Sequence, residues 1–456
     1  MIKAPIEHIP RLMTLLRNAL EKMGIVGCES KIESIAVDVF RAMSAPTRLY
    51  HTSQHIFDVA KGPEASQRIA ALFHDVIYLP VDGGVPHHWQ DLLAPYYNED
   101  QPKHIQGLNR SDSPAWFRLT CMIFGVNDSA DFTERPGLNE FLSTLVAGAL
   151  LEDILPLKDF MGIAANIEAT IPFRFNAPGP EAWYNQLQQR LLAADEQFEL
   201  GFGEKGCTTL VHHAIQIANH DIGSFAHSDP SIFFLHTWQL IAEGHRILQQ
   251  PAIYSLTDYL DRLIERRKFL EGINISRLFS SKDNVPNQAM MATMKANAAR
   301  NIDLAVRFFS AKIYTISLIK AAALLTGGDL PVALFMGSLE KENIPERLLS
   351  VYFPPTQTNE KHFTDPMLDI LLSYGLREPV TFDTQRSPIT SSLYRNVGEK
   401  GISHGFETSM KLLEEENNPQ AFLNAQPTVV SKGIFELLAN FSIVRKRAFS
   451  AHADAT

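Results

Sequence analysis

The chain has 456 residues, of which 45% are hydrophobic and 20% charged, proportions that are ordinary for a soluble globular protein. This length is sufficient for two or three domains with large cores. The formal net charge of −10 at pH 7 argues against non-specific binding to nucleic acid or anionic membranes, which requires a basic surface. The three cysteines, Cys28, Cys121 and Cys207, are odd in number and unclustered, so neither a disulfide framework nor a zinc knuckle is expected.

No segment of the sequence has the pattern of a signal peptide or of a membrane-spanning helix. Residues 1–20 lack the apolar core and the small-residue cleavage site of a signal peptide. Residues 313–327 form the most apolar stretch, but Lys320 interrupts it and it is shorter than the ~20 residues of a membrane span. A soluble, cytoplasmic protein without a membrane partner is therefore expected.

Helical periodicity predominates and predicts an all-α fold. Residues 6–23 place Ile9, Leu12, Leu16 and Leu20 on one stripe, as in a helix with one buried face. Further helices are expected at 31–43, 51–61, 64–78, 114–125, 138–150, 157–169, 180–199 and 206–223. Residues 79–113 are rich in Pro, Gly, Asn, Asp and His, and are expected to be loop with short helices. Clean alternation of apolar and polar residues is not found, so we expect little or no sheet.

The second half of the chain has a different character. Helices are expected at 256–272, 287–326 (one long helix or a close pair), 364–374, 404–416 and 430–446. We expect a domain at 1–250 and a helical domain at 251–456, whose apolar surface packs on the first domain, on itself or on a second copy in a homodimer. The basic triplet at 445–447 is expected where the last helix ends, because cations are favourable there.

Histidine and aspartate residues in apolar surroundings are the main chemical signal. His51 and His55 are four apart, a spacing that puts two side chains on one face of a helix. His74-Asp75 and Asp221 lie within apolar sequence, where an ionisable group is costly to bury unless it is paired or binds a metal. Together these residues predict a metal site built on helices.

The same residues carry a family resemblance. Tyr50-His51-x-x-x-His55-x-x-Asp58-Val59 resembles the opening signature of the cyclic-nucleotide phosphodiesterases and of their relatives, the HD-domain metal-dependent phosphohydrolases. A buried His-Asp pair follows in those families, and an Ile-x-Ala-Thr-like segment comes later, which residues 167–170 resemble. A late Ala-Asp-Leu-like motif is matched more loosely by residues 218–222. The resemblance covers about residues 30–230.

The resemblance implies an activity and a set of roles. His55, His74, Asp75 and Asp221 would bind a divalent ion (Mn, Mg, Zn or Fe), and Asp75 could bridge to a second ion. His51 would be the general acid, and a metal-bound hydroxide would attack the phosphorus of a phosphoester. The substrate would be a nucleotide or another small phosphorylated molecule.

Several positions depart from the family pattern or leave alternatives open. No histidine follows soon after Thr170 or directly after the His-Asp pair, which leaves the cyclic-nucleotide substrate and the second ion open. His220 competes with its neighbour Asp221 as the ligand. Glu99 is either a water-orienting base, by similarity to an Asn-Glu pair in small bacterial members, or a solvated acid.

The remaining candidates are positions for substrate contacts. Arg174 could face a phosphate, because its planar fork suits anionic oxygens, or it could form a structural salt bridge. His87 and His88 are either substrate contacts or surface residues, and the same holds for His104.

Two other classes of function also fit the sequence. An HD-like di-iron oxygenase would need about six ligands, which His87, His88, His104 and His213 could supplement. A non-catalytic nucleotide-binding regulatory module would use the metal site for binding alone. The GxGxxG pattern at 201–206 follows a predicted helix and not a strand, so we interpret it as a helix-to-helix turn and not as a dinucleotide site.

Overall fold

The structure is a computed structural model. It describes residues 7–98, 100, 105–106, 113–126, 132, 136–174, 180–249, 254–329, 365–375, 387–414, 418–442 and 444–456. In these residues the regular elements are helices, with two isolated β-bridges and no strand, which confirms the expected all-α fold. The candidate Glu99 and His104 lie outside the described residues.

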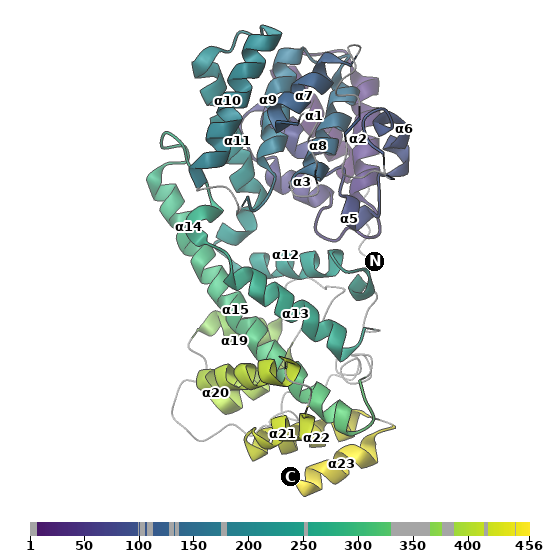
Figure 1. The fold of residues 1–456 in the computed structure, drawn as a ribbon, viewed down its shortest axis with the longest axis vertical. Helices are drawn as coiled ribbons and strands as arrows, with labels where there is room; N and C mark the ends of the chain where they lie inside the picture. The colour runs from purple at the N-terminus through teal and green to yellow at the C-terminus, as the bar shows by residue number, and fades with distance from the viewer. Residues whose placement is uncertain are drawn as a thin grey trace. The chain divides into compact units, whose positions relative to one another are not determined.

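The chain forms two compact units, shown as a ribbon in Figure 1. Unit 1 comprises Met1–Ala226 and Asn274–Ala296, and unit 2 comprises His227–Ile273 and Asn297–Thr456. The boundary expected at residue 250 therefore falls inside unit 2. The physical reason is that the helix before residue 250 packs in unit 2, whereas residues 274–296 return to unit 1.

Unit 1 contains most of the shorter helices. They are α1 (His8–Lys22), α2 (Glu29–Met43), α3 (Ser53–Val59), α4 (Ala65–Phe73), α5 (Leu79–Asp82), η1 (His87–Trp89), α6 (Gln90–Leu93), α7 (Ala115–Phe124), α8 (Leu138–Leu151), α9 (Leu157–Ala169), α10 (Pro180–Phe198), α11 (Gly203–Asp221), η2 (Gly223–Ala226) and α14 (Ile275–Leu278).

Unit 2 contains α12 (Pro230–Glu243), η3 (Arg246–Gln249), α13 (Leu256–Glu271), α19 (Pro366–Tyr374), α20 (Pro388–Glu414), α21 (Pro419–Asn424), α22 (Thr428–Phe441) and α23 (Lys446–Ala455). The helix α15 (Gln288–Leu325) begins in unit 1 and continues into unit 2. It is uninterrupted, so the single long helix is the correct one of the two expected alternatives.

Helix α9 is the centre of unit 1. Every residue from Phe160 to Ala169 is buried, as expected for a helix that is apolar on all sides. It packs against α4, α11, α7 and α8. At Gly162 an added Cβ would lie 3.3 Å from Leu210 of α11 and 3.4 Å from Ser66 of α4. Glycine at this position thus allows both α4 and α11 to pack closely against α9.

The core of unit 2 contains a group of stacked aromatic rings. Trp238 of α12 stacks on Phe309 of α15 at 4.8 Å between ring centroids and contacts Phe308 edge-on at 5.2 Å. On α20, a Cβ added at Gly405 would lie 2.4 Å from the ring of Tyr314. The helices of unit 2 thus bury their apolar surface against one another, which is one of the three arrangements expected from the sequence.

Helix α15 is long and apolar enough to cross a membrane by length and composition alone. However, 83% of its most apolar window is buried inside the protein, as in the core helix of a soluble protein. It is the one such candidate among the described residues, a pattern consistent with a soluble protein.

Some local expectations need correction. His51 is not helical, because Thr52 is extended (φ −110°, ψ 174°) and α3 begins only at Ser53. Helix α12 and the first half of α20 were not predicted.

The helix predicted at 430–446 ends earlier than expected, and a further helix that was not predicted follows it. Helix α22 ends at Phe441 and α23 begins at Lys446, so the basic triplet starts a helix instead of ending one. Arg445 nevertheless caps a helix C-terminus, because its guanidinium donates to the carbonyl oxygens of Ala323 (2.9 Å) and Gly328 (2.8 Å) at the end of α15.

The GxGxxG segment is a turn between α10 and α11, as predicted. Gly201 and Gly203 have φ of 75° and 60°, in the left-handed region that favours glycine. The carboxylate of Asp195 accepts the backbone N–H groups of Phe202 (2.9 Å) and Gly203 (2.7 Å) at the start of α11. A side chain of the same chain thus occupies the place that a phosphate would take in a nucleotide-binding loop.

Candidate metal centre

The structure brings the four predicted ligands together from three parts of unit 1. His55 lies on α3, His74 caps the C-terminus of α4 with Asp75 directly after it, and Asp221 is the last residue of α11. Each offers one ligand atom, and these atoms all lie within 4.8 Å of one another. The chain thus contains a His/Asp group that could hold a metal ion.

Nitrogen and oxygen atoms face each other across the centre. His55 Nε2 lies 3.0 Å from Asp221 Oδ1, and His74 Nε2 lies 2.9 Å from Asp75 Oδ2. The two Nε2 atoms are 3.3 Å apart. His74 Nδ1 lies 2.9 Å from the carbonyl oxygen of Ala71 and donates to it, which leaves Nε2 as the nitrogen that faces the centre.

The oxygen Oδ2 of Asp75 is the clearest sign of a missing partner. It is buried and forms no hydrogen bond of good geometry with any described residue, although imidazole nitrogens surround it. A buried polar atom without a partner is costly, and a metal ion between these groups would satisfy it. Two imidazoles and two carboxylates suit borderline divalent ions. The residues therefore fit a divalent metal.

Charge within the cluster is balanced in the absence of an ion. Burial alone would lower the pKa of His55, but the adjacent carboxylates of Asp221 and Asp75 outweigh this and raise the pKa to about 9. Burial would raise the pKa of Asp75, but the charges of His74 and His51 hold it well below its usual range. In the metal-free cluster, protons on the imidazoles thus supply the positive charge that a bound divalent cation would otherwise supply.

His51 lies beside the ligands without being one of the four. Its Nε2 is 4.0 Å from Asp75 Oδ2, and its ring centroid is 5.5 Å from that of His55. Its ring also contacts Tyr78 edge-on at 4.6 Å. The residue is therefore at the position expected of a proton donor near the metal, although it reaches that position from an extended segment and not from a helix.

A buried arginine holds this part of the site in place. Arg48 Nη1 donates to the carbonyl oxygens of Asp75 (2.7 Å) and His51 (3.4 Å). The same guanidinium forms a two-pronged ion pair with Asp82, at 2.9 Å and 2.6 Å. The Arg48 side chain is fully buried, so this ion pair ties the segment before α3 to the segment after α4. Neither Arg48 nor Asp82 belongs to a motif described in the sequence analysis.

Glu140 on α8 is a second residue that the sequence analysis missed. Burial raises the pKa of its carboxyl to about 7, and the negative charges of Asp75 and Asp221 add to the effect. Like Asp221, Glu140 is an acidic residue in an apolar helix, but the residues around it match no motif of the family that the sequence resembles. Its carboxyl group therefore lies close enough to two of the predicted ligands to be affected by their charge.

Several other candidates lie elsewhere. His87 is exposed, and His88 interacts electrostatically with Asp38 and Arg41 of α2. Arg174 forms the structural salt bridge that was one of its two expected roles, since Nη1 and Nη2 contact the carboxylate of the buried Glu168 at 3.0 Å and 3.1 Å.

The competing histidines on α11 also face away from the centre. His213 interacts with Glu64 and Lys22, and His220 with Lys61 and the backbone of Val59. Asp221 and not His220 therefore belongs to the cluster. Among the described residues, the extra histidines that a di-iron site would need are not brought to the ligands.

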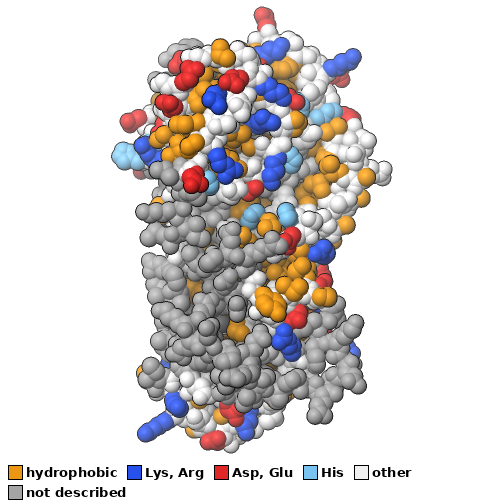
Figure 2. Space-filling view, turned by 180° about the vertical axis from the view of Figure 1, so that it is seen from behind, with side chains coloured by type: hydrophobic (Ala, Val, Ile, Leu, Met, Phe, Trp, Pro, Cys, Tyr) orange, Lys and Arg blue, Asp and Glu red, His pale blue; other side chains and the backbone are white. Residues whose placement is uncertain are grey.

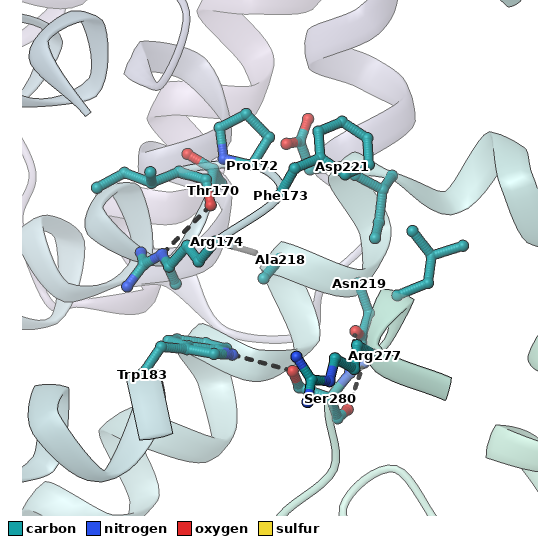
Figure 3. A pocket seen from close by; sticks show the side chains of 14 residues that line it. Thr170, Pro172, Phe173, Arg174, Trp183, Ala218, Asn219, Asp221, Arg277 and Ser280 are labelled. Carbon is teal, nitrogen blue, oxygen red and sulfur yellow. Dashed lines mark hydrogen bonds between the residues drawn. The ribbon is translucent and has the colours of Figure 1, made fainter. Parts of the chain in front are cut away.

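A cavity of about 80 Å³ adjoins the metal centre and is shown in Figure 3. Its walls come from the end of α9, the end of α11 and the segment around α14, and Asp221 is shared between the cavity and the ligand set. A cavity that holds one water molecule has a volume of roughly 10–15 Å³, so this larger cavity admits a group of several heavy atoms.

Comparison with family models, curated proteins and solved structures gave no match to this chain.

Proposed function

We propose that this protein is a divalent-metal-dependent phosphohydrolase that cleaves a phosphoester in a nucleotide or another small phosphorylated molecule. The observation that supports this most directly is the convergence of His55, His74, Asp75 and Asp221, with a buried, unsatisfied carboxylate oxygen among them. The family resemblance of the motif around these residues supplies the reaction class, and His51 stands beside the ligands as that class requires.

The residues divide the work of hydrolysis between binding and proton transfer. The four ligands would hold the ion, which when bound lowers the pKa of a coordinated water towards neutrality and polarises the phosphoryl oxygens. His51 Nε2 would donate a proton to the leaving oxygen, which departs far more easily as an alcohol than as an alkoxide. Arg48 would keep the backbone of His51 and Asp75 in register through its two carbonyl contacts. The adjoining cavity would receive the part of the substrate next to the reacting phosphate.

The test combines metal content with turnover. Elemental analysis of the purified protein should find Mn, Mg, Zn or Fe, and the double variant His74→Ala, Asp75→Ala should lose it. A panel of cyclic diesters, monoesters and nucleoside triphosphates, assayed with each of the four ions, should reveal a preferred substrate.

The general acid is tested on that substrate. His51→Ala should lower kcat about 100-fold or more while the metal content stays unchanged, because general acid catalysis contributes roughly 10²–10⁴ in rate. His404→Ala, which removes an exposed histidine of unit 2, is the matched control. Equal metal in the wild type and the double variant, or full turnover by His51→Ala, would contradict the proposal.

A further inference from the structure

Two arginines line the cavity beside the metal centre, and they are in different states. The guanidinium of Arg174 is held by the carboxylate and the backbone oxygen of Glu168 and by the carbonyl of Ile171. Arg277, on α14, is exposed, and its side chain forms no hydrogen bond or ion pair with any described residue. Arg277 is therefore the cation at this cavity that remains available to an incoming anion.

The segment that carries Arg277 is fixed to the wall of unit 1. Asn219 Nδ2 donates to the carbonyl oxygen of Ser280 (2.8 Å), and Ser280 N–H donates back to Asn219 Oδ1 (3.0 Å). Trp183 Nε1 donates to the Ser280 hydroxyl at 3.0 Å. Figure 3 shows this network, with Arg277 beside Ser280. Because Asn219 and Ser280 are buried, Arg277 projects from an anchored backbone and not from a loose loop.

The rest of the wall is suited to the carbon part of a ligand. Ile171, Ile222 and Leu278 line it together with Phe173, whose φ of 47° is uncommon for an aromatic residue. Such a backbone persists only where the surroundings hold it, and it occurs preferentially at binding sites. The cavity thus combines apolar side chains with one arginine, Arg277, that no described residue engages, and it includes the metal-ligand candidate Asp221.

We propose that Arg277 binds a second anionic group of the substrate, so that the substrates are small molecules carrying a phosphoester and a further phosphate or carboxylate. This inference rests on the proposed function, because it assumes that the reacting phosphate lies at the metal centre. The guanidinium fork matches the paired oxygens of either anion, and an exposed lysine could not reproduce that geometry. Asp221 links the two subsites, since it lines the cavity and belongs to the ligand cluster.

Binding of simple anions to the full-length protein tests the inference. Isothermal titration calorimetry would compare inorganic phosphate with pyrophosphate, and methylphosphonate with phosphonoacetate, on metal-loaded and on chelator-treated protein. The wild type should bind pyrophosphate about tenfold more tightly than phosphate, the value of one charge-assisted contact of about 1.4 kcal/mol. A preference for phosphonoacetate over methylphosphonate would show that a carboxylate is accepted as well, and its absence would restrict the second group to phosphate.

The variant Arg277→Gln should abolish the preference for pyrophosphate and leave the binding of inorganic phosphate unchanged. Arg17→Gln, which removes an exposed arginine of α1 paired with Glu21, should behave as the wild type. Equal affinities of the wild type for phosphate and pyrophosphate, or a preference retained by Arg277→Gln, would overturn the inference. Binding that depends on Arg277 without turnover of any phosphoester would instead uphold this subsite and refute the proposed hydrolysis.

Discussion

The imidazole of His55 links the chemistry of the metal site to pH. With a pKa of about 9, the ring is protonated in the metal-free protein at pH 7, whereas a metal ligand must be the neutral imidazole. Metal binding must therefore displace this proton and that of His74, whose pKa is also raised, so the affinity for the metal should rise at least tenfold per pH unit between pH 7 and 9. Competition with a chelator at several pH values would measure this, and an affinity independent of pH would contradict it.

The same raised pKa affects the stability of the metal-free protein. Because the folded-state value lies above the ordinary 6.5, the interaction of His55 with Asp221 and Asp75 stabilises the fold fully below about pH 6.5. That contribution is lost as the pH rises through about 9. Bound metal should remove this loss, since the ion replaces the proton.

Glu140 should also make the metal-free fold less stable as the pH rises, but over a lower pH range than His55. Its carboxyl has a folded-state pKa of about 7 against an ordinary 4.5, so its ionisation destabilises the fold as the pH rises from about 4.5 to about 7. In chelator-treated protein, Glu140→Gln should therefore gain about 2 kcal/mol of unfolding free energy relative to the wild type between pH 5 and pH 8. Urea unfolding at the two pH values measures this difference. An equal difference at both would mean that Glu140 is not buried beside the acidic ligands.

The sequence predicts the ligands better than the residues that support them. His55, His74, Asp75 and Asp221 stand out because a polar group within an apolar run needs a reason to be there. Arg48 has no such context, and its partner Asp82 lies 34 positions away, so their pairing becomes evident only when the chain is folded.

At the scale of elements, the Arg48–Asp82 ion pair connects the segment before α3 to the end of α5. Arg48→Met would leave the Asp82 carboxylate, only 7% exposed, without its partner. Breaking a buried pair from one side costs roughly 3–5 kcal/mol, so urea unfolding should show a loss of that order, and metal affinity should fall as well.

The double variant Arg48→Met, Asp82→Leu is the control for that prediction. Removing both charges leaves neither buried alone, so it should recover part of the lost stability. It should not recover the metal affinity, because the carbonyl oxygens of His51 and Asp75 still lack their donor. A double variant as unstable as the single one would show that the pairing itself contributes little.

Helices with one apolar stripe were predicted from periodicity, and those buried on all sides were harder to find. In α12, Phe233, Phe234 and Leu235 are consecutive and all buried, so the segment has no stripe from which a helical period can be recognised. At His51 a helix was predicted where there is none. Its spacing from His55 is helical, but Thr52 is extended and the helix begins only after it. Periodicity reports a repeating environment and does not locate the residue at which a helix starts.

At the scale of the whole molecule, the feature to consider is how acidic and basic side chains are arranged on the surface. On the face shown in Figure 2, basic side chains are interspersed with acidic ones. Among the described residues of this face, basic side chains do not form a separate area that could bind a polyanion. A homodimer remains a prediction, and sedimentation equilibrium of the full chain should give twice the mass of 51.1 kDa if it forms.

The division into units predicts the behaviour of truncated chains. A chain ending at Gln250 would keep the four ligands but would leave Trp238 of α12 without Phe308 and Phe309. It should therefore bind a hydrophobic dye such as ANS more strongly than a chain ending at Ala226, which removes α12 as well. Equal dye binding by the two chains would show that α12 does not depend on α15.

The return of residues 274–296 to unit 1 has a consequence for synthesis on the ribosome. All four ligands have emerged once Asp221 is outside the exit tunnel, but the wall that carries Arg277 follows only after the chain has passed through α12 and α13. The Asn219–Ser280 contact closes a loop of 61 residues. Its formation is slower and costs more conformational entropy than that of the local contacts within α11. The four predicted ligands can thus meet early, whereas the cavity beside them is completed late. Under the proposed function, a nascent chain would acquire its affinity for the ion before its selectivity for the substrate.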